Sequence, residues 1–368
     1  MTSREYPVPS EIGVYVIAEA GVNHNGDLEM ARRLIDVAAD AGADAIKFQT
    51  FVATEVAGKE APKAEYQRRG SDDGETQLAM LAKLELSPQM HAPLMEKCRA
   101  RDIDFLSTPF DAESAKFLAG PCDLRTLKIA SGEITNGPLL LAVAQTGKQV
   151  ILSTGMSTLE EIEAALAVLS WGYGNKIEPE SFDQILTAFR ESGNAELAGR
   201  VTLLHCTSQY PAPVTDANLR AMATMAERFE LPVGYSDHTR GIHVSTAAVA
   251  LGATVIEKHF TLDNTLPGPD HAASLEPGEL SQLVAAIRGV EAALGDGRKL
   301  PRQSELDTRV VARRSLVAAV DIASGDTLSV ANLTARRPGD GVSPMTAWDR
   351  YGMSTLDAIR AGEQVPPV

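Results

Sequence analysis

Short apolar runs alternate with longer amphipathic segments through most of the chain. The short runs are typical of buried strands, whereas the longer segments repeat apolar residues three or four positions apart, as helices do. Eight runs are predicted as strands: Val14–Ala18, Ala45–Phe48, Asp104–Leu106, Leu127–Ile129, Gln149–Leu152, Val201–His205, Pro232–Tyr235 and Thr254–Glu257. The predicted helices include Leu28–Ala41, Pro88–Arg101, Leu139–Thr146, Thr158–Trp171, Leu219–Phe229 and Ile242–Leu251. Eight strand–helix units predict a (β/α)₈ TIM barrel, with a doubly wound open sheet as the alternative.

Residues at the helix ends support the alternation. Asp27 is predicted as the N-cap of the first helix, and Gly42 follows that helix as a C′ glycine. Ser157 and Glu160 have the spacing of a capping box at the start of a later helix. The segment Glu178–Arg200 is predicted as an insertion before the sixth strand, without an assigned role.

The alternating pattern stops near residue 295. A polar stretch follows, and beyond it lie short β-like runs at Ser315–Val320 and Thr327–Ser329. We therefore predict a TIM-barrel domain over residues 1–295, a linker over 296–310 and a small β-rich domain over 311–368. The last domain is too short for a large core of its own, so we expect it to rest on another surface.

Charge and composition narrow the function. The 368 residues carry 34 Lys and Arg against 49 Asp and Glu, a net charge of −15. This balance argues against nucleic acid and against an anionic membrane surface as partners. The sequence contains no apolar stretch of membrane-spanning length and no signal-peptide pattern, and its three cysteines, Cys98, Cys122 and Cys206, do not suggest a disulfide framework. We expect a cytoplasmic protein.

Polar and charged residues lie at or just after the end of nearly every predicted strand. In a barrel these strand ends converge on one rim, which is where barrel enzymes bind and react. The residues are Glu19, Lys47, Gln49, Thr108, Lys128, Ser131, Glu133, Ser153, His205, Cys206, Tyr210, Ser236, Asp237, His238, Glu257, Lys258 and His259. Packing alone would not place such residues at eight successive strand ends.

Two pairs of these residues have chemistry of their own. Lys47 and Lys128 lie in apolar strands, where a cation needs an anionic partner, although a lone lysine is usually solvated. His238 and His259 end neighbouring strands and could hold a divalent metal, although packed rim histidines are more common. Asp237 and Glu257 are possible partners behind such a metal site. Lys128 could alternatively be the nucleophile of a Schiff-base aldolase.

A series of motifs then points to a family. In order along the chain, the motifs are IAEAGVNHNGD, IKFQTF, STPFD, KIASGE, LSTGM, LHCTSQYPAP, GYSDHT, IEKHFTLD and PGPDHAASLEP. Together they resemble the sialic acid synthase family, which condenses phosphoenolpyruvate with an N-acetylated sugar. The segment RRPGDGVSP resembles part of the antifreeze-like (SAF) domain that follows the barrel in those enzymes. The resemblance covers roughly residues 14 to 365.

The resemblance implies a role for each rim residue. His238 and His259 would hold a divalent metal, commonly Mn²⁺, that polarises the open-chain aldehyde of the sugar and positions a water. Glu133, Glu19 and Glu257 join these histidines as the catalytic candidates. Phosphoenolpyruvate would contact Lys47, Thr108, Lys128, Ser131, Ser153, Ser208 and Ser236. Ser208 stands where some relatives have Asn, and Asn25 stands where some have Glu.

The sugar side of the site extends into the tail. Gln49, Tyr210 and Asp270 match family positions that hold the sugar. Arg337 matches an arginine that reaches the barrel of the other subunit, which implies a homodimer with exchanged C-terminal domains. A rigid, forked and permanently charged Arg suits such a contact better than Lys.

The leading hypothesis is that the protein is a synthase that uses N-acetylmannosamine to make N-acetylneuraminate. The alternative acceptor is a 2,4-diacetamido-6-deoxy hexose, as in legionaminate or, less closely, pseudaminate synthases. Segments 61–67 and 268–277 look closer to neuraminate and legionaminate synthases than to pseudaminate ones. A non-catalytic sugar-binding protein is the remaining alternative, and the number of charged strand ends argues against it.

Overall fold

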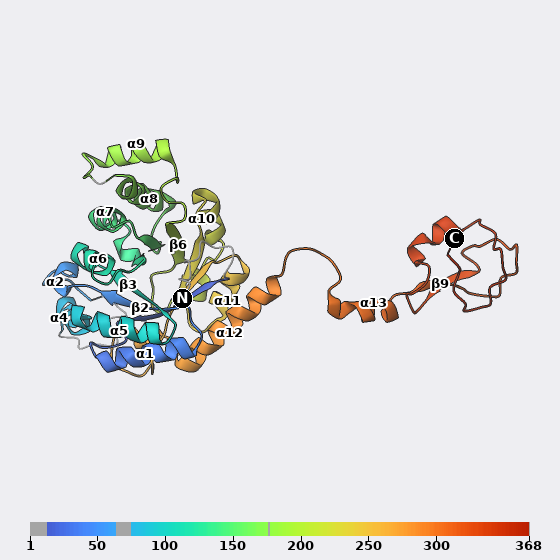
Figure 1. Cartoon of the computed structure of the whole chain (residues 1–368), viewed down its shortest axis with the longest axis horizontal. Coiled ribbons are helices and arrows are strands. Elements are labelled where there is room, and N and C mark those ends of the chain that lie inside the picture. Colours follow the sequence, from blue (N-terminus) through green and yellow to red (C-terminus); the bar gives the residue numbers. More distant parts are fainter. Residues whose placement is uncertain (1–12, 64–74, 176, 368) are drawn as a thin grey trace. The chain divides into compact units, whose positions relative to one another are not determined.

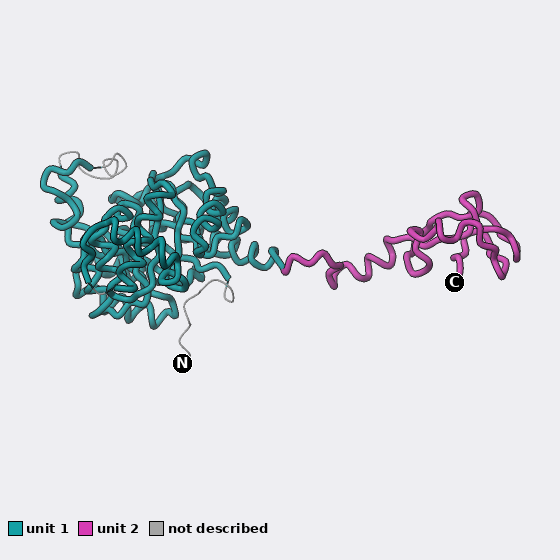
Figure 2. The backbone as a smooth tube through the Cα atoms, turned by 90° about the horizontal axis from the view of Figure 1, so that it is seen from above, with its two compact units in different colours: residues 1–295 teal, residues 296–368 magenta. Residues whose placement is uncertain are grey.

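The computed structural model describes residues 13–63, 75–175 and 177–367. The chain divides into two compact units, residues 1–295 and residues 296–368, which are drawn in different colours in Figure 2. Part of the acceptor-related segment 61–67 lies outside the described residues.

Eight parallel strands form the centre of the first unit. They are β1 (Tyr15–Gly21), β2 (Ala45–Thr50), β3 (Asp104–Pro109), β4 (Thr126–Ile129), β5 (Gln149–Ser153), β6 (Val201–Cys206), β7 (Val233–Asp237) and β8 (Val255–His259). Their hydrogen-bonded order is β3-β2-β1-β8-β7-β6-β5-β4, and β3 also lies against β4. Strand β1 thus pairs with both β2 and β8, as a barrel requires. The predicted TIM barrel is confirmed, and the open doubly wound sheet is wrong.

Helices surround these strands (Figure 1). They are α1 (Leu28–Asp40), α2 (Ala53–Val56), α4 (Gln77–Leu84), α5 (Pro88–Ala100), α6 (Ala112–Ala119), α7 (Gly137–Gln145), α8 (Leu159–Gly174), α9 (Phe182–Ser192), α10 (Ala221–Phe229), α11 (His243–Ala250) and α12 (Pro277–Leu294). Helix α1 shows why they form. Its buried residues Leu34, Ile35 and Ala38 share one face. Asp27 accepts a hydrogen bond from Met30 N at 2.7 Å, as its N-cap role predicts.

The later capping box lies one residue further along the chain than predicted. Thr158 Oγ1 accepts from Glu161 N, and the Glu161 carboxylate accepts from Thr158 N. Ser157 instead donates its hydroxyl to Gly155 O. The prediction was wrong by one position because Ser and Thr are adjacent, and each has a Glu three residues later. The predicted insertion at 178–200 contains helix α9.

The barrel has apolar residues on both sides of its strands. Inward-facing residues form a small cluster inside the strands: Tyr15, Ile17, Ala45, Leu106, Ile151, Leu204 and Val255. The alternate residues, such as Val16 and Ile46, belong to the larger core between strands and helices. Two buried layers are expected for parallel strands covered by helices. Because side chains fill the interior of the barrel, the carboxyl ends of the strands are the place where a ligand can enter.

The second unit is small and β-rich. Its strands β9 (Ser315–Ala318) and β10 (Leu333–Arg336) pair antiparallel over a cluster that includes Leu316, Ile322 and Leu328. Helix α13 (Leu306–Ala312) contains the predicted domain boundary at 311, and α14 (Ala347–Arg350) is a single turn. Across the parts of the chain that the structure describes, no helix combines the length and apolar character needed to cross a membrane.

Candidate active site

One cavity of about 460 Å³ opens at the carboxyl ends of the barrel strands. It brings together every site residue that the sequence predicts in the barrel. These are Glu19, Lys47, Gln49, Thr108, Lys128, Ser131, Glu133, Ser153, Ser208, Tyr210, Ser236, His238, Glu257, His259 and Asp270. The residues come from all parts of the barrel chain, so the sequential strand order is what gathers them.

Strand register places the charged residues side by side. Glu19 on β1 pairs in register with Lys47 on β2 and with His259 on β8. Ser236 on β7 is in register with Glu257 on β8. Because side chains alternate along a strand, Glu257 and His259 lie on the same face of β8. These five charged and polar residues are therefore held on the strands themselves.

The charges in the cavity are buried and paired. Lys47 Nζ lies 2.7 Å from Glu19 Oε2 and 3.6 Å from Glu257 Oε2. Lys128 Nζ lies 3.5 Å from Glu257 Oε1. Lys47 also donates to Thr108 Oγ1 at 3.1 Å. Buried charges of this kind are stable only when paired, and each pair leaves donors that can turn to an anionic ligand.

The two carboxylates have different proton affinities. Burial raises the pKa of Glu19 to about 7, although Lys47 opposes the shift. Burial acts on Glu257 as well, yet Lys128 and Lys47 together lower its pKa to about 2. Glu257 is therefore the fixed anion between the lysines. Glu19 is the carboxyl group that can exchange a proton near neutral pH.

Hydroxyl groups line the same cavity beside the lysines. Ser236 donates to Glu257 Oε1 at 3.0 Å, and Ser131 accepts from Gly155 N at 3.0 Å. The structure records no hydrogen-bond partner for the buried Ser153 hydroxyl. A side chain at Gly155 would come within 2.3 Å of Ser208 Oγ. These hydroxyls converge on one space and can serve an anion together.

His238 and His259 meet at the mouth of the cavity. Their ring centroids are 5.5 Å apart, and Thr207 O accepts a hydrogen bond from His238 Nδ1 at 2.7 Å. This bond leaves the lone pair of His238 on Nε2. The structure records no partner for the buried His259 Nδ1. Burial lowers the pKa of His238 to about 4 and lowers the pKa of His259 well below its ordinary value.

His238 Nε2 lies 3.4 Å from Ser236 Oγ, a contact that a metal would replace. Two neutral imidazoles, each with a lone pair on one ring nitrogen, fit a divalent metal of the Mn²⁺ or Zn²⁺ class. Among the described residues, no group of three or more His, Cys, Asp or Glu side chains has metal-binding geometry. A metal held by His238 and His259 would therefore complete its coordination with water or substrate. The donor set is compatible with the predicted metal, whose presence stays a prediction.

Polar groups for the acceptor gather around Gly21. A Cβ built at Gly21 would lie 3.3 Å from Glu19 Oε1, 3.4 Å from Gln49 Nε2 and 3.5 Å from Asp270 Oδ2. Gly21 has a φ of +52° and follows an irregularity in the β1–β2 ladder. Burial raises the pKa of Asp270 to about 6. Three hydrogen-bonding groups thus face one point that only a glycine leaves open.

Tyr210 and Glu133 lie at the edge of the site. The Tyr210 ring packs 4.1 Å from the His238 ring between centroids. Glu133 belongs to a short 3₁₀ turn (Ser131–Glu133) and accepts a hydrogen bond from Asn136 Nδ2 at 2.8 Å. Both side chains are half-buried and line the cavity, so both can reach a bound substrate.

Three polar strand-end residues point elsewhere. Asp237, considered above as a partner behind the metal site, forms a buried ion pair with Lys258 at 3.0 Å. It also accepts from Ser245 Oγ at 2.6 Å, so its charge is balanced away from the cavity. His205 Nε2 donates a hydrogen bond to Ala217 O at 2.8 Å. Each is one residue away from an inward-facing position, and strand alternation explains the difference.

Arg337 belongs to the second unit. It is exposed, and its Nε donates to Ala312 O at 2.9 Å. Its predicted contact with a partner subunit stays a prediction. The sequence reasoning also missed an apolar part of the cavity wall, contributed by Val22, Val56, Met80, Leu81, Leu84, Phe110 and Met156. Apolar residues in short loop helices have no signal that separates a wall from an ordinary core.

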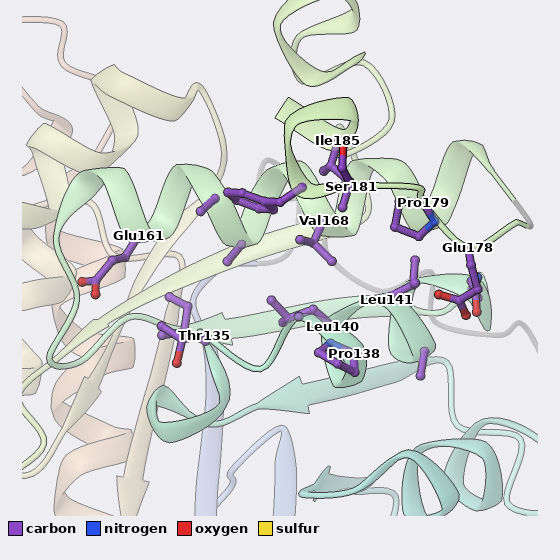
Figure 3. Close-up of a pocket in the computed structure, with 17 residues that line it drawn as sticks. Thr135, Pro138, Leu140, Leu141, Glu161, Val168, Glu178, Pro179, Ser181 and Ile185 are labelled. Carbon is purple, nitrogen blue, oxygen red and sulfur yellow. The ribbon is translucent and has the colours of Figure 1, made fainter. Parts of the chain in front are cut away.

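A second cavity, of about 510 Å³, lies among α7, α8 and the start of α9 (Figure 3). Figure 3 shows that aliphatic side chains such as Leu140, Leu141 and Val168 face this space, with Glu161 and Glu178 on opposite sides of it. Among the residues that the structure describes, its lining includes neither lysine nor histidine. The cavity at the strand ends does have the cations that a phosphorylated substrate needs, so it is the candidate active site.

Known proteins resemble the chain along most of its length. Residues 34–299 match the NeuB family, and residues 313–368 match the SAF domain. The chain is 49% identical over 330 residues to N,N'-diacetyllegionaminic acid synthase of Campylobacter jejuni, covering 90% of this chain and 92% of that protein. It is 46% identical to N,N'-diacetyllegionaminic acid synthase of Legionella pneumophila, covering 97% and 94% respectively.

A solved structure supports the same relationship. N-acetylneuraminic acid (sialic acid) synthetase from Leptospira borgpetersenii is 37% identical to this chain, with a TM-score of 0.66 over 81% of this chain and 90% of that one. The resemblance read from the sequence motifs, to sialic acid synthases with a SAF domain, is confirmed. The chain belongs to the NeuB family and carries a SAF domain after its barrel.

Proposed function

We propose that this protein condenses phosphoenolpyruvate with a 2,4-diacetamido-6-deoxy hexose to give a legionaminate-type nonulosonic acid and phosphate. The similarity of 49% and 46% to two N,N'-diacetyllegionaminic acid synthases supports this acceptor. It replaces N-acetylmannosamine, which the sequence motifs favoured. The N-acetylneuraminic acid synthetase of Leptospira borgpetersenii is 37% identical.

One observation carries the reaction class. Two buried lysines, Lys47 and Lys128, share the anion Glu257 in a cavity that is also lined by four serine hydroxyls and Thr108. A carboxylate and a phosphate need such donors from several directions. Phosphoenolpyruvate brings its own activated carbon, so the protein's part is orientation and electrostatic stabilisation.

The bond changes balance with one water. Carbon 3 of phosphoenolpyruvate forms a bond to the aldehyde carbon, and the aldehyde oxygen takes up a proton. Water adds to carbon 2, and the bond between carbon 2 and the phosphate oxygen breaks. Glu19, whose raised pKa allows it to hold a proton near neutral pH, is placed beside Gln49 and Asp270 to supply one to the acceptor. Glu133 is the second candidate for proton transfer.

His238 and His259 would hold the divalent metal, for which Mn²⁺ is the leading candidate. Such an ion supplies Lewis acidity toward a carbonyl oxygen when it is bound. The protein's contribution is to keep both imidazoles neutral by burial and to fix the His238 tautomer through Thr207 O. The Tyr210 ring packs against both histidines and restricts their orientation.

We also propose that the enzyme is a homodimer with exchanged tails, in which Arg337 completes the acceptor site of the partner subunit. The second unit has a small core, and its surface exposes Trp348, Met345 and Leu356. Exposed apolar side chains on so small a unit favour contact with another surface.

A phosphate-release assay tests the proposed function. The purified protein is incubated with phosphoenolpyruvate and each of several N-acetyl hexosamines, with and without added Mn²⁺. Release of phosphate only when both substrates are present, fastest with the 2,4-diacetamido-6-deoxy acceptor, is the expected result. Absence of phosphate release with every acceptor under metal-replete conditions contradicts the proposal.

A Schiff-base aldolase remains the second candidate because burial lowers the pKa of Lys128, as a nucleophilic lysine requires. Borohydride added with a carbonyl substrate would then trap a covalent adduct on Lys128, and chelators would have no effect. Trapping without any requirement for phosphoenolpyruvate would favour the aldolase over the synthase.

A further inference from the structure

The candidate active site has two chemically different sides. One side is lined by charged, hydroxyl and imidazole groups, and on the other side five residues form a continuous apolar surface: Val22, Met80, Leu81, Leu84 and Phe110, here called the apolar wall. Val22, Met80 and Leu84 are buried, and Leu81 and Phe110 pack against them. The wall therefore offers the ligand methyl and methylene groups, with an aromatic ring at its edge.

Helix α4, which carries three of the wall residues, is held in place by the barrel. Glu85, directly after α4, accepts a hydrogen bond from Ala53 N at 2.6 Å. The β1–α1 loop approaches the end of α4 so closely that a Cβ at Gly26 would lie 2.6 Å from Lys83 O. Phe110 packs edge-on against Phe51, which follows β2. The wall is thus a preformed, packed surface whose shape does not depend on a bound ligand.

The wall borders the acceptor half of the cavity. Val22 follows Gly21, the point at which Glu19, Gln49 and Asp270 converge. These groups come from β1, β2 and the segment after β8. The hydroxyls proposed for phosphoenolpyruvate lie at β5 and β7 and after β4, as Ser153, Ser236 and Ser131 show. The apolar wall is therefore next to the sugar and away from most of the phosphate donors.

We propose that the apolar wall receives a methyl group that N-acetylmannosamine lacks, and thereby selects an acceptor with this additional methyl over N-acetylmannosamine. This inference rests on the proposed function and adds its specificity determinant. A hydroxyl placed against the wall would lose its hydrogen bonds to water without replacement, which weakens binding. A methyl group that leaves water for the wall strengthens binding through the hydrophobic effect. The methyl can belong to a deoxygenated terminal carbon or to a second N-acetyl group.

Four acceptors separate these two sources. They are N-acetylmannosamine, its 6-deoxy form, its 4-acetamido form with the 6-hydroxyl retained, and the 2,4-diacetamido-6-deoxy sugar. We expect kcat/KM to rise about tenfold or more with the methyl that meets the wall, the usual discrimination for one apolar group in a pocket. A rise in the 6-deoxy arm assigns the terminal methyl, and a rise in the 4-acetamido arm assigns the acetyl methyl.

Variants of the wall residues then test whether the wall causes the preference among these acceptors. Met80→Gln keeps the length of the side chain and makes it polar. The preference for the acceptor with the additional methyl over N-acetylmannosamine is therefore expected to fall to about threefold or less. Met80→Leu is the apolar match and is expected to keep it. The KM for phosphoenolpyruvate is expected to stay unchanged in both variants. Leu251→Gln, an exposed position at the end of α11, is the control for an added amide elsewhere.

Leu81→Gln provides the same test at a half-buried position, in case Met80→Gln does not fold. A preference that survives both folded amide variants overturns the inference, as does a wild-type enzyme that uses all four acceptors equally. In either case phosphate release with phosphoenolpyruvate would still stand, so the proposed reaction class would survive. Equal use of all four acceptors would also contradict the proposed acceptor, whereas a preference that survives in the variants would not. An enzyme that releases phosphate with none of the four acceptors fails at the proposed function instead.

Discussion

Glu19 Oε2 lies 2.7 Å from Lys47 Nζ, and each side chain is only 2% exposed. The two residues are in register on neighbouring strands, so the barrel holds their backbones side by side. A charge pair buried this deeply ties the stability of the fold to the chemistry of the site. Removing one partner leaves an unpaired buried charge, which is far more costly than removing both.

Lys47→Met should therefore harm both folding and function. We expect a loss of about 3–5 kcal/mol in the free energy of unfolding, measured by urea titration, together with a raised KM for phosphoenolpyruvate. Glu19→Gln combined with Lys47→Met should recover part of the stability but not the KM. Lys97→Met removes a half-exposed partner of Asp36 and should cost about 1 kcal/mol or less. An unchanged KM for phosphoenolpyruvate in Lys47→Met would contradict the assignment.

Metal removal should abolish the proposed activity. Exhaustive chelation is expected to stop phosphate release and Mn²⁺ to restore it, while His238→Ala and His259→Ala should each lose activity and bind less Mn²⁺ by direct titration. The exposed His243, which is outside the cavity, provides His243→Ala as the control. Full turnover after chelation, with metal content verified, would exclude the metal role.

Gly21→Ala tests the convergence of acceptor groups. The new methyl would lie within 3.5 Å of side-chain atoms of Glu19, Gln49 and Asp270, so the acceptor KM should rise severalfold while the KM for phosphoenolpyruvate stays near its wild-type value. Gly252→Ala is the matched control, because Gly252 also has a positive φ, +97°, but no atom lies within 4 Å of its added Cβ. Equal effects of the two changes on acceptor KM would show that backbone strain alone is responsible.

Stability should fall in acid because of His24. Burial, together with His91, lowers the pKa of His24 to about 4 from an ordinary value near 6.5. The contribution of neutral His24 to the free energy of unfolding is present above pH 6.5 and is lost as the pH falls toward 4. In this range the unfolded chain binds a proton at His24, whereas the folded chain does not. His24→Asn should reduce the pH slope by about 1.4 kcal/mol per unit in that range. Urea unfolding at several pH values measures this, and an unchanged slope would refute it.

The exchanged-tail proposal has a test by complementation. Arg337→Ala and His259→Ala chains are each expected to be inactive alone, but when unfolded and refolded together they should regain activity if tails act across the dimer. A mixed dimer then pairs one intact barrel with one intact Arg337. If tails act within their own chain, every chain carries one lesion and the mixture stays inactive. An inactive mixture with heterodimers verified by mass would falsify the exchange.

The strands and the polar half of the site could be predicted because each leaves a local signal. An apolar run that ends in a polar residue is visible in the sequence, and Lys47 in AIKF is an example. The direction of each side chain was less clear. Asp237 and Lys258 pair on the outer side of β7 and β8, whereas His238 and His259, one residue later, face the cavity. A one-residue uncertainty in a strand exchanges the two faces.

The apolar wall could not be predicted for a different reason. Met80 and Leu84 lie on an eight-residue helix whose pattern is that of any helix packed on a core. Only the fold shows that this helix borders the cavity rather than the barrel interior. In the same way, Gly21 is an unremarkable glycine until Glu19, Gln49 and Asp270 are seen around it.

The charged and the apolar residues of the site come from different parts of the chain. The charged half is distributed over many strand ends, so no single insertion or deletion can replace it. Three of the five wall residues instead lie together on the eight-residue helix α4, and Phe110 lies just after β3. Exchanging α4 between homologues should therefore change which sugar is accepted and leave the phosphoenolpyruvate donors on the strand ends in place. Acceptor choice would then be a portable property of one short helix.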